Sequence, residues 1–328
     1  MINTEEDPIV ERKIGEKTLR MQQSHKLPLY YERFPFYDRA LPRISKKVSE
    51  IDGYLSFIDI GANIGDTISL ITDKVNGSFL CVEGDKNYAQ FLKANISSLK
   101  NSNVTIEECY CGETYNQSEG LTIHRENGTA RLEADKGIVG QDNVKLKSLD
   151  NIIKENPLFK ETNLLKIDTD GFEINVLKSG GEFIKKCHPL IYFEFDPELY
   201  SINHKEPLII FDFLYEHGYY EALLYDNFGV PVKIISTSNR NEIKSLVKLI
   251  DKKKIYYFDV LTFHDSKKSQ YEAIFGNELF SCLSSFNDLL HLTQTKLDSV
   301  TNELSAIHSS REWRFMRLLR KVRNIFPF

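Results

Sequence analysis

Two acidic residues stand near the ends of apolar segments, at a spacing that suits a nucleoside. Asp59 belongs to the apolar segment 57–60, which runs into a glycine-containing turn, and Glu83 directly follows a second apolar segment, 79–82. In an α/β sheet a ligand binds beside the carboxyl ends of the strands, and a carboxylate there can accept hydrogen bonds from both hydroxyls of a ribose. The two acids therefore predict a crevice that holds an adenosine.

The turn after Asp59 narrows the choice of cofactor. It reads Gly61-x-Asn63-x-Gly65, without the middle glycine of a dinucleotide fingerprint and without the lysine of a P-loop. A loop that need not cradle phosphate fits S-adenosylmethionine (SAM), whose amino and sulfonium groups are cationic, and Asp59 and Glu83 supply negative charge. We expect these five residues to bind SAM; the alternative is an ordinary strand–turn–helix corner without a ligand.

Three later segments carry a resemblance to a known family. They are L-D-N-I-I at 149–153, L-L-K-I-D-T-D-G-F-E at 164–173, and the apolar segment 189–193 that ends in Glu194. Together with the glycine loop, they resemble the FkbM family of SAM-dependent methyltransferases over about residues 25–265. The resemblance implies a Rossmann-like methyltransferase sheet with helices on both faces, and O-methyl transfer onto sugars or other hydroxylated natural products.

The sequence departs from the family pattern at Thr169-Asp170, where valine and glutamate are usual. Because aspartate and glutamate have the same charge, we expect the role to survive. The resemblance does not identify the acceptor. A glycan or lipid-linked sugar in bacterial polysaccharide biosynthesis is the expectation that follows from it.

Transfer of a methyl group to a sugar hydroxyl requires alignment and a base. Alignment can supply about 7–11 kcal/mol, and a base about 10²–10⁴-fold in rate. Asp168 ends an apolar strand and is the first candidate for that base, and we expect Lys166 to point to the other face. Glu194 and His264 are the further catalytic candidates, although a lone histidine is more often structural. Glu173 is expected to stabilise a helix terminus.

The pattern Asp168-x-Asp170 also allows an alternative interpretation, a metal-dependent glycosyltransferase. An apolar strand that ends in D-x-D resembles the metal and nucleotide-sugar site of GT-A glycosyltransferases, in which carboxylates hold Mn²⁺ or Mg²⁺. The Gly-x-Glu that follows fits that alternative poorly, and we predict no metal site. A third hypothesis is a scaffold without catalysis that recruits glycan enzymes to a membrane, but a scaffold has no need of acids at strand ends.

The chain of 328 residues is predicted to form three parts. Residues 51–265 alternate apolar strands with helical patterns, as a doubly wound sheet does. Residues 1–50 contain the aromatic segment 29–39, which is expected to form a lid or acceptor wall, or to clamp the sheet edge. Residues 266–328 form a helical tail. The predicted strands are 55–60, 79–83, 104–109, 164–168 and 190–195, with an inserted strand at 119–124. The resemblance to methyltransferases implies a closing antiparallel pair at 219–225 and 256–263.

The tail contains an apolar heptad pattern. Apolar residues recur in steps of four and three from Leu279 to Ile307, with a break only at Thr293. The pattern predicts a long helix with a coiled-coil-like seam. The seam at 279–307 is expected to form a homodimer, to bind a protein of glycan assembly, or to lie against the core.

Residues 310–328 mix basic and apolar side chains. Residues 311–328 carry a local charge of +5, so the rest of the chain carries −10, since the total is −5. A short helix on an anionic membrane surface is expected, with docking on the protein itself as the alternative. The pattern also loosely resembles tails of bacterial polysaccharide glycosyltransferases and methyltransferases.

The composition limits location and partners. No apolar stretch approaches the ~20 residues of a membrane span, and no signal-peptide pattern opens the chain. We therefore expect a cytoplasmic protein, and the basic tail adds the expectation of peripheral contact with the inner membrane face. An acidic main body argues against nucleic acid as a partner. The five cysteines lack zinc-type spacing and are predicted to be ordinary packing residues.

Overall fold

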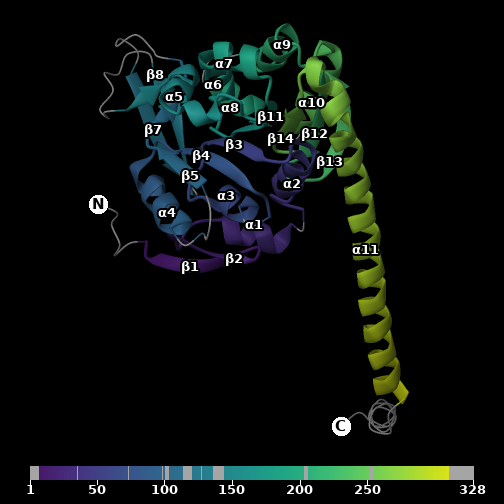
Figure 1. Cartoon of the computed structure of the whole chain (residues 1–328). Helices are drawn as coiled ribbons and strands as arrows, with labels where there is room; N and C mark the ends of the chain where they lie inside the picture. The colour runs from purple at the N-terminus through teal and green to yellow at the C-terminus, as the bar shows by residue number, and fades with distance from the viewer. Residues whose placement is uncertain are drawn as a thin grey trace. The chain divides into compact units, whose positions relative to one another are not determined.

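The structure is a computed structural model with two compact units. It describes residues 7–309 except 35, 73, 98, 100–102, 114–119, 127, 136–143, 203–205 and 252–254. The first unit extends to Glu278, and the second begins at Leu279 (Figure 1).

An eight-stranded mixed sheet forms the centre of the first unit. Its strand order is β13-β12-β14-β11-β10-β3-β4-β5. The five strands from β11 to β5 are parallel, and β14 runs antiparallel to both β11 and β12. The strands span β3 (Leu55–Ile60), β4 (Gly77–Val82), β5 (Asn103–Glu107), β10 (Leu164–Ile167), β11 (Leu190–Phe195), β12 (Glu221–Asp226), β13 (Pro231–Ser236) and β14 (Phe258–Thr262).

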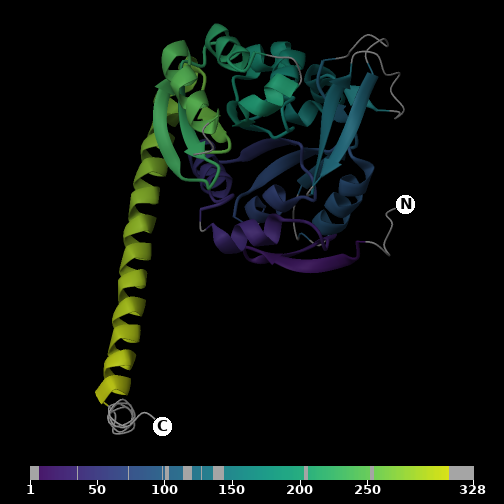
Figure 2. The ribbon, with the colours of Figure 1, turned by 180° about the vertical axis from the view of Figure 1, so that it is seen from behind.

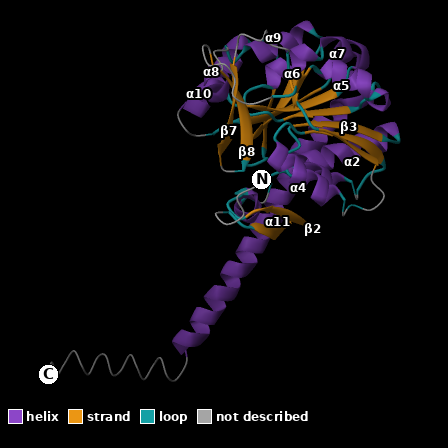
Figure 3. Cartoon of the chain, turned by 90° about the vertical axis from the view of Figure 1, so that its left-hand side faces the viewer, coloured by secondary structure: helices purple, strands orange, loops and turns teal. Residues whose placement is uncertain are grey.

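Helices cover both faces of this sheet, as Figures 1 and 3 show. One face carries α2 (Ala40–Asp52), α3 (Asp66–Ile71) and α4 (Lys86–Ile96). The other carries α5 (Leu149–Glu155), α6 (Glu173–Ser179), α7 (Gly181–Cys187), α8 (Pro197–Ile202), α9 (Ile209–Glu216) and α10 (Arg240–Asp251). The expected α/β fold is therefore confirmed.

Burial on two faces explains why the central strands are continuous apolar runs. Every residue of β3 is buried, and so is every residue of β10. Strands covered by helices on both sides have no solvent face, so their apolar residues do not alternate with polar ones. The helices begin where local polar side chains cap them: Asp85 accepts hydrogen bonds from two backbone N–H groups of α4, and Ser148 from one of α5.

The predicted elements are largely present. The antiparallel pairing of β12 with β14 is confirmed, but β14 lies inside the sheet, and the unexpected strand β13 forms the edge. The inserted strand is β7 (Gly120–Glu126). It pairs with β8 (Thr129–Asp135) in a hairpin outside the main sheet, at the opposite end from β12 and β13 (Figure 2). The segment predicted as one strand at 104–109 instead ends at Glu107, and β6 (Tyr110–Cys111) pairs with β9 (Leu146–Lys147).

The N-terminal region packs on helices, and its aromatic segment also reaches the sheet edge, where Phe34 contacts Phe228 in the turn between β12 and β13. Strands β1 (Ile9–Ile14) and β2 (Lys17–Gln22) form a hairpin that precedes α1 (Leu27–Arg33). The amide of Asn95 on α4 binds the backbone N–H and C=O of Arg20. Apolar residues of the hairpin share a buried cluster with α1, α4 and the loop before α3. The hairpin thus anchors residues 25–39 beside the strand ends.

The compact unit includes the start of the C-terminal helix. Helix α11 (Lys268–Ser309) follows a 3₁₀ turn at Asp265–Lys267. Glu278 on its fourth turn is buried and ion-pairs with Arg43 at 2.7 Å. Because these first turns pack on the core, the boundary lies at 278/279, thirteen residues later than the predicted 265/266.

The second unit is the remainder of α11. The helix predicted by the heptad pattern is present, and Leu283, Leu297 and Val300 on the seam are exposed. Pairing of the seam stays a prediction. The basic segment 310–328 lies outside the described residues. None of the described helices is long and apolar enough to cross a membrane.

Candidate active site

Three neighbouring strands end together and bring the predicted chemical groups to one edge. Ile60 pairs with Val82 on one side and with Ile167 on the other, and each is the last residue of its strand. Gly61, Glu83 and Asp168 therefore follow adjacent strand ends. The ladder continues one step further, because the N–H of Gly61 donates to Val82 O and the N–H of Asp168 donates to Ile60 O.

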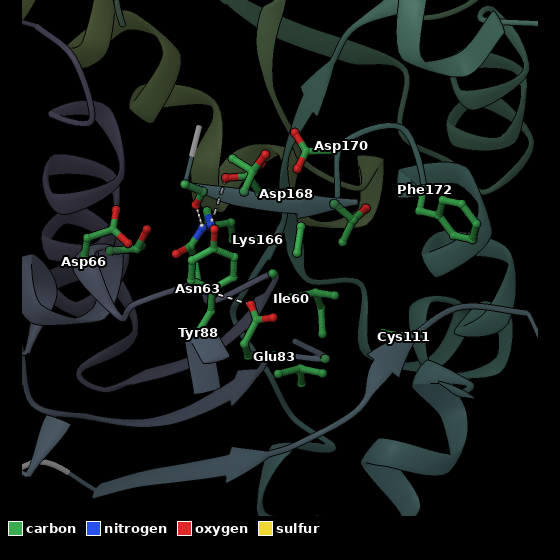
Figure 4. A pocket seen from close by; sticks show the side chains of 18 of the residues that line it. Ile60, Asn63, Asp66, Glu83, Tyr88, Cys111, Lys166, Asp168, Asp170 and Phe172 are labelled. Atoms are coloured by element: carbon green, nitrogen blue, oxygen red, sulfur yellow. Dashed lines mark hydrogen bonds and ion pairs between the residues drawn. The ribbon is translucent and has the colours of Figure 1, made fainter. Parts of the chain in front are cut away.

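A cavity of about 170 Å³ lies at this edge. Figure 4 shows Lys166 and Asp168 together above Glu83, with Asp66 on one side and Phe172 on the other. Its walls come from residues 25–38, the loops after β3, β4 and β10, residues 109–111, and the tip and second strand of the β7–β8 hairpin. The aromatic N-terminal segment thus contributes to the cavity wall, and its role as a lid or acceptor wall stays a prediction.

Glu83 is held in the cavity by backbone groups. The N–H of Asn63 donates to Glu83 Oε2 at 2.8 Å, and the N–H of Asp85 donates to Oε1 at 2.7 Å. Each carboxylate oxygen keeps a further lone pair for a ligand hydroxyl. Burial raises the pKa of Glu83 to about 7, against the lowering effect of these two hydrogen bonds.

The glycine loop is shaped by close contacts. Gly61 has φ +84°, and a Cβ there would lie 1.8 Å from Asp168 O, so only glycine fits. Asn63 lines the cavity, and its side-chain amide donates to Gly128 O at 2.8 Å, which ties the loop to the hairpin. Gly65 precedes α3 with φ +82° and packs on Leu92. Gly65 shapes the loop and does not line the cavity.

Asp59 has a buried lysine as its partner. It lies opposite Lys166 in the β3–β10 ladder, and Lys166 Nζ contacts Asp59 Oδ1 at 3.0 Å. Asp59 is fully buried and does not line the cavity, whereas Lys166 does. Burial raises the pKa of Asp59 to about 6, and Lys166 opposes that rise. The predicted contact of Asp59 with the cofactor therefore has no support from its position.

Lys166 also contacts Asp168, contrary to expectation. Its Nζ lies 3.2 Å from Asp168 Oδ2. Residues two apart on a strand point to the same face, so the expectation that Lys166 turns away from Asp168 is wrong. Asp168 lines the cavity, its side chain is 45% exposed, and Lys166 orients its carboxylate.

Three further carboxylates line the cavity: Asp38, Asp66 and Asp170. Burial, followed by the charge of Asp168, raises the pKa of Asp170 to about 7. Burial also raises the pKa of Asp66, and that of Asp38 well above its usual range. The sequence analysis missed Asp38 and Asp66. An acid that opens a helix, as Asp66 does, usually indicates only a favourable helix terminus.

Glu194 and Glu173 lie behind the cavity. Glu194 is not part of its lining and stands opposite Asp259 in the ladder. Burial, then the charges of Asp168 and Asp170, raises the pKa of Glu194 well above its usual range. Glu173 accepts hydrogen bonds from the N–H groups of Thr169 and Gly171 at the start of α6. This is the helix-terminus role expected of Glu173.

His264 lies at the other end of the strands, near the start of β11 and away from the strand ends that border the cavity. It follows β14, whose last residue, Thr262, pairs with Ile191 near the start of β11. Its ring stacks on His188 with centroids 3.5 Å apart. The expectation that His264 deprotonates the acceptor is wrong, because β14 runs antiparallel and carries its end away from the cavity.

The lining suits SAM. Five carboxylates and one amine line the cavity, which favours a cation over a pyrophosphate. Cys109, Cys111 and Phe172 give the end near Glu83 an apolar wall suited to an adenine. Among the described residues, no three or more His, Cys, Asp or Glu side chains are grouped so as to hold a metal ion.

Two features define a Rossmann-like SAM-dependent methyltransferase. One is the sheet order, in which the antiparallel strand β14 lies beside the β12–β13 hairpin, and the other is Glu83, which accepts a hydrogen bond from the glycine loop. The family model of the methyltransferase FkbM domain matches residues 59–220. Residues 59–220 therefore form a methyltransferase domain of the FkbM type.

Solved structures of methyltransferases match the chain distantly. Methyltransferase FkbM from Methylobacillus flagellatus KT is 16% identical over 49% of this chain and 37% of its own, with a TM-score of 0.33. The precorrin-6y C5,15-methyltransferase from Geobacter metallireducens is 12% identical over 67% of this chain and 86% of its own, with a TM-score of 0.33. The plantazolicin methyltransferase BpumL in complex with SAH is 10% identical over 72% of this chain and 87% of its own, with a TM-score of 0.37. No curated protein matches the chain.

Proposed function

We propose that the protein transfers the methyl group of SAM to a hydroxyl of a glycan or lipid-linked sugar. The observation that carries the proposal is the convergence of Gly61, Glu83 and Asp168 on one cavity from three adjacent strand ends. The place of the acceptor in surface-polysaccharide biosynthesis rests only on the resemblance of the sequence to proteins of that process.

Glu83 and the acidic lining would hold the cofactor. Glu83, fixed by two backbone N–H groups, is placed to accept hydrogen bonds from the ribose hydroxyls. Asp66 faces the same space and would attract the cationic methionine end. When bound, SAM supplies an electrophilic methyl group on a sulfonium, which is a good leaving group.

Asp168 is the base in this proposal. It lies at the mouth of the sheet, and Lys166 fixes one of its oxygens. A carboxylate in this position accepts the proton of an acceptor hydroxyl as that oxygen attacks the methyl group. The contact with Lys166 also weakens the glycosyltransferase alternative, because an ammonium group at 3.2 Å opposes binding of a divalent cation by Asp168.

Titration of SAM and assay of methyl transfer to hydroxylated sugars test the proposal. We expect Glu83→Gln to weaken SAM binding about 10-fold or more, since a hydrogen bond to a charged group contributes roughly 1.5–3 kcal/mol. Asp168→Asn should bind SAM almost as wild type but lose about 10²-fold in kcat. Glu216→Gln, an exposed carboxylate on α9, is the matched control. Wild-type turnover by Asp168→Asn would remove Asp168 as the base, and absence of SAM binding would refute the whole proposal.

We propose further that residues 310–328 hold the protein at the inner face of the cytoplasmic membrane. The support is the charge of this segment, since each basic residue near an anionic surface contributes about 1 kcal/mol. Removal of 310–328 should abolish sedimentation with anionic vesicles and preserve transfer to a soluble acceptor. Unchanged vesicle binding by the shortened protein would contradict this.

A further inference from the structure

One wall of the cavity comes from outside the family domain. Residues 25–38 precede the matched range 59–220, and Tyr30, Tyr37 and Asp38 from this segment line the cavity. The cofactor groups described above, Glu83 and the glycine loop, all lie within the matched range. The N-terminal wall is therefore a candidate for recognition of the acceptor.

Asp38 lies among other acids. Burial and the charges of Asp66, Asp259 and Asp168 raise its pKa and Lys166 lowers it, so a bound ammonium group would favour its ionised form. Lys166 is already shared by Asp59 and Asp168. Bound SAM adds two positive groups and one negative group to a cavity lined by five carboxylates. An acidic acceptor would be repelled here, whereas a cationic one would be attracted.

Aromatic rings accompany this carboxylate. The rings of Tyr30 and Tyr37 lie 5.4 Å apart between centroids, and both residues line the cavity beside Asp38. Aromatic faces next to a carboxylate form the arrangement that binds ammonium groups, through the ring quadrupole and the opposite charge.

The backbone at Asp38 supports a binding role. Asp38 has φ +51°, in the left-handed region. Non-glycine residues adopt this conformation rarely, and such positions cluster at active and binding sites. The preceding turn is closed by the hydrogen bond from Arg39 N–H to Phe36 O.

We infer that the acceptor is a hydroxylated sugar with a free, protonated amine, and that Asp38, Tyr30 and Tyr37 bind this amine. The inference rests on the proposed function, because the acceptor shares the cavity with SAM. Asp38 is thus a specificity-determining residue, and the hydroxyl beside the amine is the one presented to Asp168.

Calorimetric titration of the full chain, saturated with SAH, tests the inference directly. The probes are methyl glucosaminide, methyl glucoside and methyl glucuronide, which differ in charge but share the ring. We expect the glucosaminide to bind at least 10-fold more tightly than the glucoside, and the glucuronide to bind most weakly. Asp38→Asn should reduce the first ratio to within about 2-fold, and Asp38→Glu should retain it. Glu32→Gln, an exposed acid on α1, should match wild type.

Equal binding of the three sugars by wild type, tighter binding of the glucuronide, or no binding at millimolar concentrations overturns the inference. An unchanged ratio in Asp38→Asn with an unchanged melting temperature removes Asp38 from it. Transfer of labelled methyl groups is measured separately. Selective binding of the glucosaminide without transfer would contradict the proposed function and leave the ammonium site supported.

Discussion

Among individual residues, Lys166 and the carboxylates around it determine the charges in the cavity. Lys166 balances Asp59 inside the sheet and orients Asp168 at its edge. Burial is the first cause of the raised pKa values of Glu83, Asp170 and Glu173, each about 7.

These shifts predict how stability depends on pH. An acid whose pKa is near 4 in the unfolded chain and about 7 in the folded protein binds more protons when folded. Its contribution to stability is complete below the unfolded value and is lost as the pH rises through the folded value. The melting temperature of the ligand-free protein should therefore fall by several degrees from pH 5 to pH 8.

Thermal unfolding with and without SAM measures how the melting temperature depends on pH. SAM should stabilise the protein more at pH 8 than at pH 6, because ionised Glu83 is the better acceptor for the ribose hydroxyls. Glu173→Gln should flatten the pH profile, since it removes one of the shifted acids. A melting temperature that rises from pH 5 to pH 8 would contradict the assignment.

At the scale of the secondary-structure elements, the cofactor site is formed by two loops that follow strand ends and contact each other. The loop from β3 to α3 touches the loop from β10 to α6 at Gly61 and Asp168. The hairpin β7–β8 adds a cover, joined to the first loop by Asn63 and to the cap of α4 by the ion pair of Arg125 with Asp85. The geometry of the cofactor site thus depends on how closely these backbones approach.

Gly61→Ala tests that approach. A Cβ at Gly61 meets backbone atoms of Asp168, which cannot move aside cheaply. The matched control is Gly53→Ala, because Gly53 also has a positive φ, +76°, but a Cβ there has nothing within 4 Å. We expect the control to cost about 1–2 kcal/mol from the left-handed backbone alone. Gly61→Ala should cost roughly 1–3 kcal/mol more and weaken SAM binding. Urea unfolding measures both, and equal losses would refute the close contact.

At the scale of the whole molecule, the chain divides into two compact units. Residues up to Glu278 contain the sheet and the cavity with its N-terminal wall. Beyond Leu279, Leu297 and Val300 are 58% and 52% exposed on a predicted heptad seam. Apolar residues repeated at this spacing favour pairing with another helix.

We predict that the seam forms a homodimer. Leu297→Glu combined with Val300→Glu should convert a dimer into a monomer in sedimentation velocity, because charges at seam positions cannot be buried. Ser299→Glu, on the same helix but off the seam, should remain dimeric. A monomeric wild type would contradict the homodimer.

Local chemistry of the sequence was enough to predict much of the fold. The apolar runs of β3 and β11 are buried on both sides, and such burial requires continuous apolar residues. The position of Glu83 beside the glycine loop also follows from the chain itself, since adjacent parallel strands end at one edge.

Only the tertiary structure decided which side chains reach the cavity and which charges pair, because both depend on contacts between distant segments. The direction of β14 placed His264 at the wrong edge for catalysis, and a run of apolar residues carries no sign of its direction. Asp38 and Tyr37 reach the cavity only because the N-terminal hairpin packs on α4. The ladder of β3 with β10 set Lys166 beside Asp59, so the pairing of those charges depended on strand register, which no local pattern encodes.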